Sequence, residues 1–193
     1  MSALETALAE ARACRLCAAE LPLGPRPVLQ AGRSARLMVV GQAPGTRVHA
    51  SGIPFNDPSG DRLRAWLGID RETFYDATRL AILPMGLCYP GQDARGADKP
   101  PKKICAPTWH PRLRPLLPRL ELTLLVGQYA QARYLGPARK KTLTETVRAW
   151  RDYGPDFLPL PHPSWRNTAW LKRNPWLEAE ILPELRRRVE ALL

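Results

Sequence analysis

The chain has 193 residues, 45% of them hydrophobic, so it is long enough to bury the core of one domain. It carries 29 Lys and Arg against 18 Asp and Glu, and this net charge of +11 favours a polyanionic partner such as nucleic acid. The sequence contains neither an apolar run of roughly 20 residues, as a membrane span requires, nor the basic-then-apolar pattern of a signal peptide. We therefore expect a cytoplasmic monomer that forms a single domain over residues 1–193.

Short apolar runs alternate with segments of helical pattern along the whole chain. Strands are predicted at 36–42, 78–85, 122–127 and 156–161. Helices are predicted at 2–13, 61–69, 109–120, 128–136, 143–154 and 174–193. Long loops are predicted at 46–60 and 88–108, and loops of this length in a compact domain are usually functional.

Individual residues mark the expected helix ends. Ser59 suits the N-cap of the second helix, and the third helix is expected to start around Trp109. Gly136 is expected to close the helix before it. Asn174 and Pro175 suit the N-cap and first position of the C-terminal helix.

The alternation of strands and helices predicts an α/β fold, a three-layer α/β/α sandwich with a central four-stranded, mostly parallel sheet. Right-handed crossovers place the carboxyl ends of the strands at one edge, where open α/β sheets bind ligands. Those ends carry the segments GQAPG, PMGLC, GQYA and HPSWRN. Chain order alone therefore brings His162 near Gln42.

Two of these segments contain residues that suit a binding site. Gly41 and Gly45 in GQAPG allow backbone N–H groups to approach a ligand, although a tight turn would use the same residues. The segment is neither a dinucleotide fingerprint nor a phosphate-binding P-loop. His162 lies between two prolines, where an imidazole could hydrogen-bond a developing anion or merely cap a loop.

Aromatic and polar residues beside these ends suit a flat, anionic ligand. Phe55 follows a proline in a polar loop, so its ring is either a stacking platform or a plug that anchors the loop. Ser164, Trp165, Arg166 and Asn167 follow His162 without further regular structure and suit phosphate contacts and insertion between bases. Packing over the C-terminal helix is the alternative role for Trp165.

Four cysteines form the other group of interest: Cys14, Cys17, Cys88 and Cys105. Disulfides are not expected in a cytosolic chain. Only one C-x2-C pair is present, so a zinc ribbon fits less well than a cubane iron–sulfur cluster with one close pair and two distant ligands. Zinc and unrelated buried thiols stay open as alternatives.

With these segments in order, the sequence resembles the uracil-DNA glycosylase superfamily, and most closely its bacterial and archaeal iron–sulfur branches. The matching pieces are CRLC, VVGQAPG, SGIPFNDPSG, the two later cysteines, LLVGQ and HPS. The family fold is a three-layer sandwich around a four-stranded parallel sheet. Its enzymes flip a damaged base out of DNA and hydrolyse the N-glycosidic bond.

The resemblance implies roles for individual residues. His162 would stabilise negative charge on the departing base, and Ser164 to Asn167 would contact DNA. The four cysteines would hold a structural 4Fe-4S cluster. The implied base-binding set is Gly41, Gln42, Ala43, Gly45, Phe55 and Asn56. The expected catalytic set is His162, Gln42 and Asp57.

The chain departs from the family pattern at three places. Gln42 stands where the iron–sulfur branch has an acid, and Ala43 stands where better-known uracil enzymes have the water-activating aspartate. Asp57, Asp61 and His49 are the candidates to replace that base. Pro84 stands where the family often has a uracil-reading asparagine, so Asn56 or Gln42 would take that role. The loop DKPPKKIC lacks the histidine of a branch that links covalently to DNA, so no covalent trapping is expected.

Three functions remain open from the sequence. The first is a monofunctional DNA N-glycosylase acting on uracil or a related deaminated base, with damaged DNA as partner. The second is a catalytically weak or inactive DNA-binding module on the same fold. The third is a nucleotide hydrolase that does not act on DNA.

Overall fold

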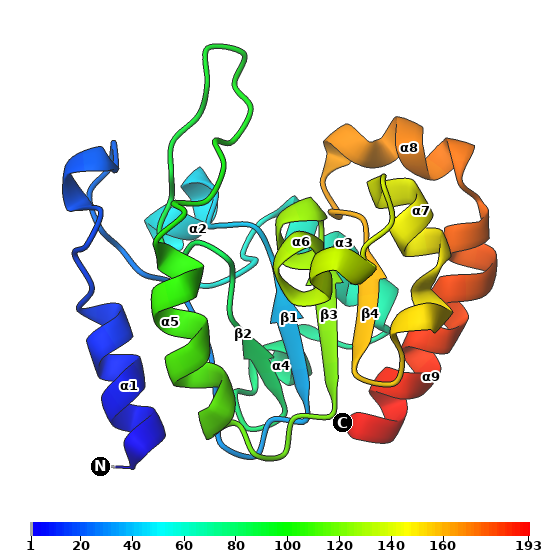
Figure 1. Ribbon diagram of the computed structural model, residues 1–193, viewed down its shortest axis with the longest axis horizontal. Coiled ribbons are helices and arrows are strands. Elements are labelled where there is room, and N and C mark those ends of the chain that lie inside the picture. The colour runs from blue at the N-terminus through cyan, green and yellow to red at the C-terminus, as the bar shows by residue number, and fades with distance from the viewer. Residues whose placement is uncertain (1) are drawn as a thin grey trace.

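The computed structural model describes residues 2–193 as a sheet with helices on both faces (Figure 1). The sheet has four parallel strands in the spatial order β2-β1-β3-β4. The strands are β1 (Leu37–Val40), β2 (Leu80–Ile82), β3 (Leu122–Val126) and β4 (Phe157–Leu160). The predicted α/β sandwich is confirmed, and each strand lies within its predicted range.

Strand β1 lies inside the sheet because it pairs with β2 on one side and with β3 on the other. Leu37 is opposite Leu80 in the first pairing and opposite Leu122 in the second. Strand β3 then pairs with β4, with Thr123 opposite Phe157. Strands β1, β2 and β3 are buried along their length, as parallel strands covered on both faces must be. The carboxyl ends of all four strands therefore meet at one edge.

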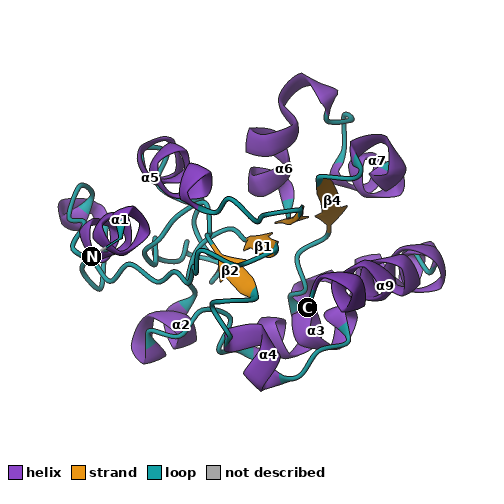
Figure 2. Ribbon diagram, turned by 90° about the horizontal axis from the view of Figure 1, so that it is seen from below, coloured by secondary structure: helices purple, strands orange, loops and turns teal. Residues whose placement is uncertain are grey.

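Helices cover both faces of this sheet (Figure 2). They are α1 (Ala3–Arg12), α2 (Thr46–Ser51), α3 (Pro58–Leu67), α4 (Arg71–Tyr75), α5 (Cys105–Leu113), α6 (Gln128–Leu135), α7 (Leu143–Arg148), α8 (Thr168–Arg173) and α9 (Leu182–Leu192). Leu37 and Val39 belong to a core shared with α3, α4, α7 and α9. Met38 and Val40 belong to a second core shared with α1, α5 and α6. Within residues 2–193 none of these helices is long and apolar enough to cross a membrane.

Two helix starts differ from the prediction. Helix α3 is capped by Asp57 and not by Ser59, because the Asp57 carboxylate accepts the Gly60 N–H at 2.8 Å and Pro58 takes the first helical position. Helix α5 begins at Cys105 and not at Trp109, since the buried side chain of Cys105 extends the packed face toward the N-terminus. The predicted loop 46–60 also contains the short helix α2.

The C-terminal quarter contains more regular structure than predicted. The residues after His162 form a 3₁₀ turn, Trp165–Asn167, that leads directly into α8. Asn174 does not cap the next helix, because its side-chain amide donates backward to the Trp170 carbonyl at 2.8 Å. A π-helical turn, Leu177–Ile181, precedes α9. The closure of α6 at Gly136 is as predicted.

On the face of the sheet covered by α5, a buried histidine contacts the segment that follows β2. His110 in α5 is only 3% exposed, and its Nε2 lies 3.1 Å from the Pro84 carbonyl oxygen. Its Nδ1 lies 2.8 Å from the Tyr134 hydroxyl. A neutral ring with the proton on Nε2 donates to the carbonyl and accepts from the hydroxyl, so both nitrogens are satisfied. Burial lowers the pKa of His110 to about 4.

The first prediction concerns stability against pH. The folded pKa of His110 lies below the unfolded value of about 6.5, so the unfolded chain binds more protons between these values. The contribution of neutral His110 is present above pH 6.5 and is lost as pH falls toward 4, by roughly 3 kcal/mol at most. We expect the difference in unfolding free energy between wild type and His110→Gln to shrink over this range in denaturant titrations. A constant difference would contradict the buried, neutral imidazole.

Candidate active site

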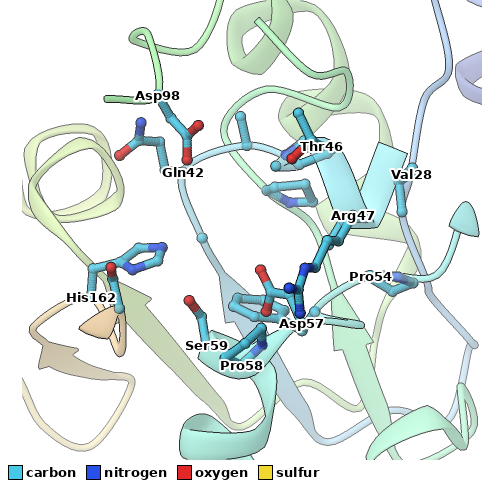
Figure 3. A pocket seen from close by; sticks show the side chains of 18 of the residues that line it. Val28, Gln42, Thr46, Arg47, Pro54, Asp57, Pro58, Ser59, Asp98 and His162 are labelled. Carbon is cyan, nitrogen blue, oxygen red and sulfur yellow. The ribbon is translucent and has the colours of Figure 1, made fainter. Parts of the chain in front are cut away.

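A cavity of about 280 Å³ opens at the carboxyl edge of the sheet (Figure 3). Its wall combines the GQAPG turn after β1, Pro84 after β2 and the HPSWR segment after β4. The start of α2, the loop before α3 and two residues of the loop after β2, Gln92 and Asp98, complete it. Segments more than 100 residues apart in the chain thus share one small space, at the place where α/β sheets bind ligands.

Phe55 is held in this wall by an unusual backbone. Its φ of 53° lies in the left-handed region, which a bulky residue rarely adopts. Its ring meets Phe74 edge-on at 6.1 Å, and a Cβ on Gly41 would lie 3.1 Å from its Cζ. A Cβ on Gly60 would lie only 1.7 Å from the Phe55 carbonyl oxygen. The two glycines therefore let the Phe55 ring lie against the end of β1 at the cavity wall.

His162 follows β4, and its ring points into the cavity (Figure 3). The Asn167 side-chain amide donates to the His162 carbonyl at 2.7 Å and fixes the backbone. Burial lowers the pKa of His162, and the carboxylates of Asp57 and Asp98 oppose this to a smaller extent. The imidazole is therefore neutral at pH 7 and offers one N–H donor to a group in the cavity.

Two further predicted residues in the wall already have partners within the protein. The Asp57 carboxylate lines the cavity while one of its oxygens caps α3. The Gln42 side-chain amide donates to the Lys99 carbonyl at 3.3 Å. Both side chains therefore combine a place in the wall with a contact that fixes a neighbouring segment.

The rim beside β4 is basic and aromatic. Trp165 is 70% exposed, and the Arg166 guanidinium lies over its ring at 5.4 Å. Arg166 also donates to the Gly96 carbonyl at 2.5 Å. Arg62 donates to the Ser164 carbonyl at 3.0 Å and holds the segment against α3. An exposed ring on a rigid, cationic rim suits contact with a nucleic acid.

Most of the predicted site residues come together here. The lining includes Gly41, Gln42, Ala43, Gly45, Phe55, Asp57, His162, Ser164, Trp165 and Arg166. Asn56 does not line the cavity, because its side-chain oxygen accepts from Arg71 at 2.9 Å. Asn167 also lies outside it and acts on the His162 backbone instead.

Neither of the other two candidates for a catalytic base lines the cavity. The Asp61 side chain is 74% exposed and forms an ion pair with Arg64. His49 packs its ring 6.1 Å from that of Tyr89.

Two charged residues of the lining were not predicted. Arg47 of α2 extends into the cavity, and Asp98 reaches it from the loop after β2 (Figure 3). Both lie in the two long loops that the sequence marked as functional, but loop length alone does not single out a residue. The only local signal for Arg47 was its charge, two residues after GQAPG.

The four cysteines line a second, smaller cavity. All four are free, and the cavity between them has a volume of about 10 Å³. Burial raises the pKa of Cys88 to about 11 and that of Cys105 to about 12. The Leu87 N–H donates to the Cys105 sulfur at 3.2 Å. A raised pKa is the opposite of what a reactive thiolate needs, so Cys88 and Cys105 do not suit a nucleophilic role.

The four thiols of this cavity are ligands of the kind that structural zinc ions and iron–sulfur clusters use. Within residues 2–193, no group of three His, Cys, Asp or Glu side chains is placed to hold a single metal ion. The Trp109 ring lines the same cavity, and its buried N–H has no hydrogen-bond partner among residues 2–193. A buried indole N–H normally has an acceptor, and sulfur of a cluster would supply one.

Comparison with known proteins identifies a family that includes most of the residues of this site. The family model of the uracil DNA glycosylase superfamily matches residues 29–186, which include nearly all of the cavity lining and two of the four cysteines. A solution NMR structure of a Methanosarcina acetivorans protein, described as a candidate uracil DNA glycosylase, matches with 15% identity and a TM-score of 0.47. That match covers 85% of this chain and 98% of the other. At this TM-score it carries no further argument.

The second prediction concerns Gly60. We expect Gly60→Ala to destabilise the protein by on the order of 2–3 kcal/mol, because the new Cβ meets the Phe55 carbonyl and neither backbone can yield cheaply. Gly45→Ala is the matched control, since a Cβ there meets nothing within 4 Å. Thermal denaturation measures both. Equal melting temperatures for the two variants would contradict the close approach of Phe55 to α3.

Proposed function

The chain belongs to the uracil DNA glycosylase superfamily, and we propose that it is a monofunctional DNA N-glycosylase that removes uracil or a related deaminated base. One observation carries the proposal. A neutral His162 and the Phe55 ring share a cavity of about 280 Å³ at the ligand-binding edge of the sheet. A flipped base needs a stacking surface and hydrogen bonds at its edge, and these two side chains supply both.

Cleavage begins with the base outside the DNA stack. In the proposed complex the base stacks on Phe55 while the GQAPG backbone contacts its edge. The C1′–N bond then breaks, and its electron pair leaves with the base. The His162 N–H stabilises the anion on the base, and the Asp57 carboxylate faces the cationic sugar that remains. Water adds to C1′ and leaves an abasic site.

Contacts with DNA are proposed for the rim. Trp165 would enter the stack left by the flipped base, and Arg166 and Ser164 would face phosphates. Arg47, which reaches the cavity from α2, adds a further cation near the backbone of the flipped nucleotide. The net charge of +11 supports binding whose strength falls with salt.

We further propose that Cys14, Cys17, Cys88 and Cys105 hold a structural 4Fe-4S cluster, as in the iron–sulfur branches of the superfamily. The four thiols and the unpartnered Trp109 N–H support this proposal. When bound, such a cluster joins α1 to the start of α5 and takes no part in hydrolysis. The nearby chain supplies N–H groups that fit anionic sulfur.

A second candidate function rests on the GQAPG turn, which places Ala43 where the best-known uracil enzymes carry an acid. The protein would then be a DNA-binding module that has lost catalysis. Salt-sensitive binding to damaged DNA without an abasic product would select it.

The third prediction tests the glycosylase proposal. Labelled DNA strands carrying one uracil, hypoxanthine or xanthine, or undamaged bases only, are incubated with protein and treated with alkali, which cuts at abasic sites. We expect cleavage at a deaminated base and a loss of at least about 10²-fold in His162→Ala, because one charge-stabilising donor is removed. Loss of activity through protonation of His162 should begin at a lower pH than an ordinary histidine would give, since burial lowers the pKa of His162.

His49→Gln is the control for this prediction, because that histidine lies outside the cavity. It should retain the wild-type rate. Full activity of His162→Ala would overturn the role of the imidazole. Tight binding without cleavage at any lesion would select the inactive module.

The fourth prediction tests the cluster. Anaerobically purified protein should contain close to four irons per chain and absorb broadly near roughly 400 nm. Cys105→Ala should lose the iron and most of the absorbance, whereas Leu16→Ala should keep both. Leu16 lines the same cavity but is 60% exposed and has no metal-binding atom. Wild-type protein without iron, or with one zinc per chain, would contradict the proposal.

A further inference from the structure

The loop after β2 forms a narrow projection, residues 91–99, here called the finger (Figure 1). Gln92 and Asp98 form an isolated antiparallel bridge across it. The Asp93 carboxylate accepts the N–H groups of Arg95 and Ala97, both at 2.9 Å, and so closes the tip. The finger is therefore a hydrogen-bonded turn with a defined shape.

Two residues of the active-site motifs hold the finger. The Gln42 amide donates to the Lys99 carbonyl at 3.3 Å, and the Lys99 N–H donates across the base of the finger to the Gly91 carbonyl at 2.9 Å. Arg166, from the segment after β4, donates to the Gly96 carbonyl at 2.5 Å. The GQAPG and HPSWRN segments thus both contact the finger through side chains.

These contacts place Asp98 in the wall of the active-site cavity. Figure 3 shows its carboxylate beside Gln42, with Asp57 across the cavity. One oxygen of Asp98 accepts the Gln92 side-chain amide at 3.2 Å. Within the described residues, the other oxygen makes no hydrogen bond. The carboxylate is also near enough to His162 to act on its charge.

The alternative carboxylates have other tasks. Asp57 caps α3 with one oxygen, and this cap holds the loop that carries Phe55. Asp61 forms an ion pair with Arg64 and does not line the cavity. Asp98 is the cavity carboxylate without a structural contact to a helix.

We propose that Asp98 is the general base that activates the attacking water, and that Gln42 is a positioning residue that sets its place. This rests on the proposed glycosylase function. As the C1′–N bond breaks with its electron pair going to the base, the water oxygen bonds to C1′. The water proton passes to the Asp98 carboxylate and from there to solvent, while the base anion takes a proton from solvent. Water is the only co-reactant.

This assignment explains the Gln42 substitution in the motif. A carboxylate at position 42 could not donate a hydrogen bond and would be repelled by the Lys99 carbonyl oxygen. The side-chain N–H of Gln42 donates to that oxygen instead. The motif glutamine then acts through the backbone next to Asp98. In this proposal the catalytic carboxylate lies in the finger and not in the GQAPG motif.

The fifth prediction compares two variants of the same finger. Single-turnover excision is measured on DNA carrying the base that wild type removes, with affinity measured on the same DNA carrying a 2′-fluoro nucleotide that resists cleavage. We expect Asp98→Asn to lower the rate by about 10²–10⁴-fold at unchanged or tighter affinity. Asp93→Asn makes the same change of charge and keeps an acceptor at the tip, so its rate should stay within about threefold of wild type.

A double variant tests the role of Gln42. If Gln42 acts through Asp98, Gln42→Leu lowers the rate in wild type but has little further effect in Asp98→Asn. If the rate losses of Gln42→Leu and Asp98→Asn multiply in the double variant, Gln42 does not act through Asp98 and its positioning role is wrong. A normal rate for Asp98→Asn, whatever the rate of Asp57→Asn, would overturn the assignment of the base. An inactive wild type would instead refute the glycosylase proposal itself.

Discussion

The parallel hydrogen-bonded pairing of the four strands is the constraint on which the site depends. Because β1, β3 and β4 are adjacent and run in the same direction, Gly41 and His162 emerge at the same edge with only the end of β3 between them. The residue at that end is Gly127, whose φ is +86°. A Cβ on Gly127 would lie 3.7 Å from the Cβ of His162. The imidazole therefore has room to turn into the cavity from β4.

A second constraint operates at the start of α3. The chain must pass Phe55 in a left-handed conformation and then begin a helix three residues later. The Asp57 cap stabilises that start by about 1 kcal/mol, and the Gly60 N–H that it binds belongs to the residue whose missing Cβ admits the Phe55 carbonyl. The left-handed Phe55 backbone and the helix start that accommodates it lie within five residues of each other. The position of the Phe55 ring and the capping of α3 are thus one local arrangement.

The sequence predicted the sheet well because buried parallel strands appear as short apolar runs, such as LMVV and LTLLV. It missed helix α2, since TRVHAS spans only six residues and its one buried residue is Val48. It misplaced the start of α3 because Asp57 and Ser59 are both good N-caps, although Pro58 suits the first helical position after Asp57. Asp98 could not be predicted, because its position depends on contacts from Gln42 and Arg166 across long stretches of chain.

The position of the cysteines in the sequence suggests how the proposed cluster could support the active-site cavity without lining it. Cys88 and Cys105 enclose the finger, so tying both sulfur atoms to one rigid group closes the loop that carries Asp98. Closing a loop of this length removes conformational freedom that the finger would otherwise have to lose on binding DNA. Cys14 and Cys17 would fasten the same group to α1, and Lys102 already pairs with Glu20 across this junction at 2.8 Å. A structural cluster would thus hold the chain on both sides of the finger, while Gln42 contacts the finger at Lys99 and Arg166 contacts it at Gly96. Asp98 lies between these two contacts in the sequence and faces the cavity.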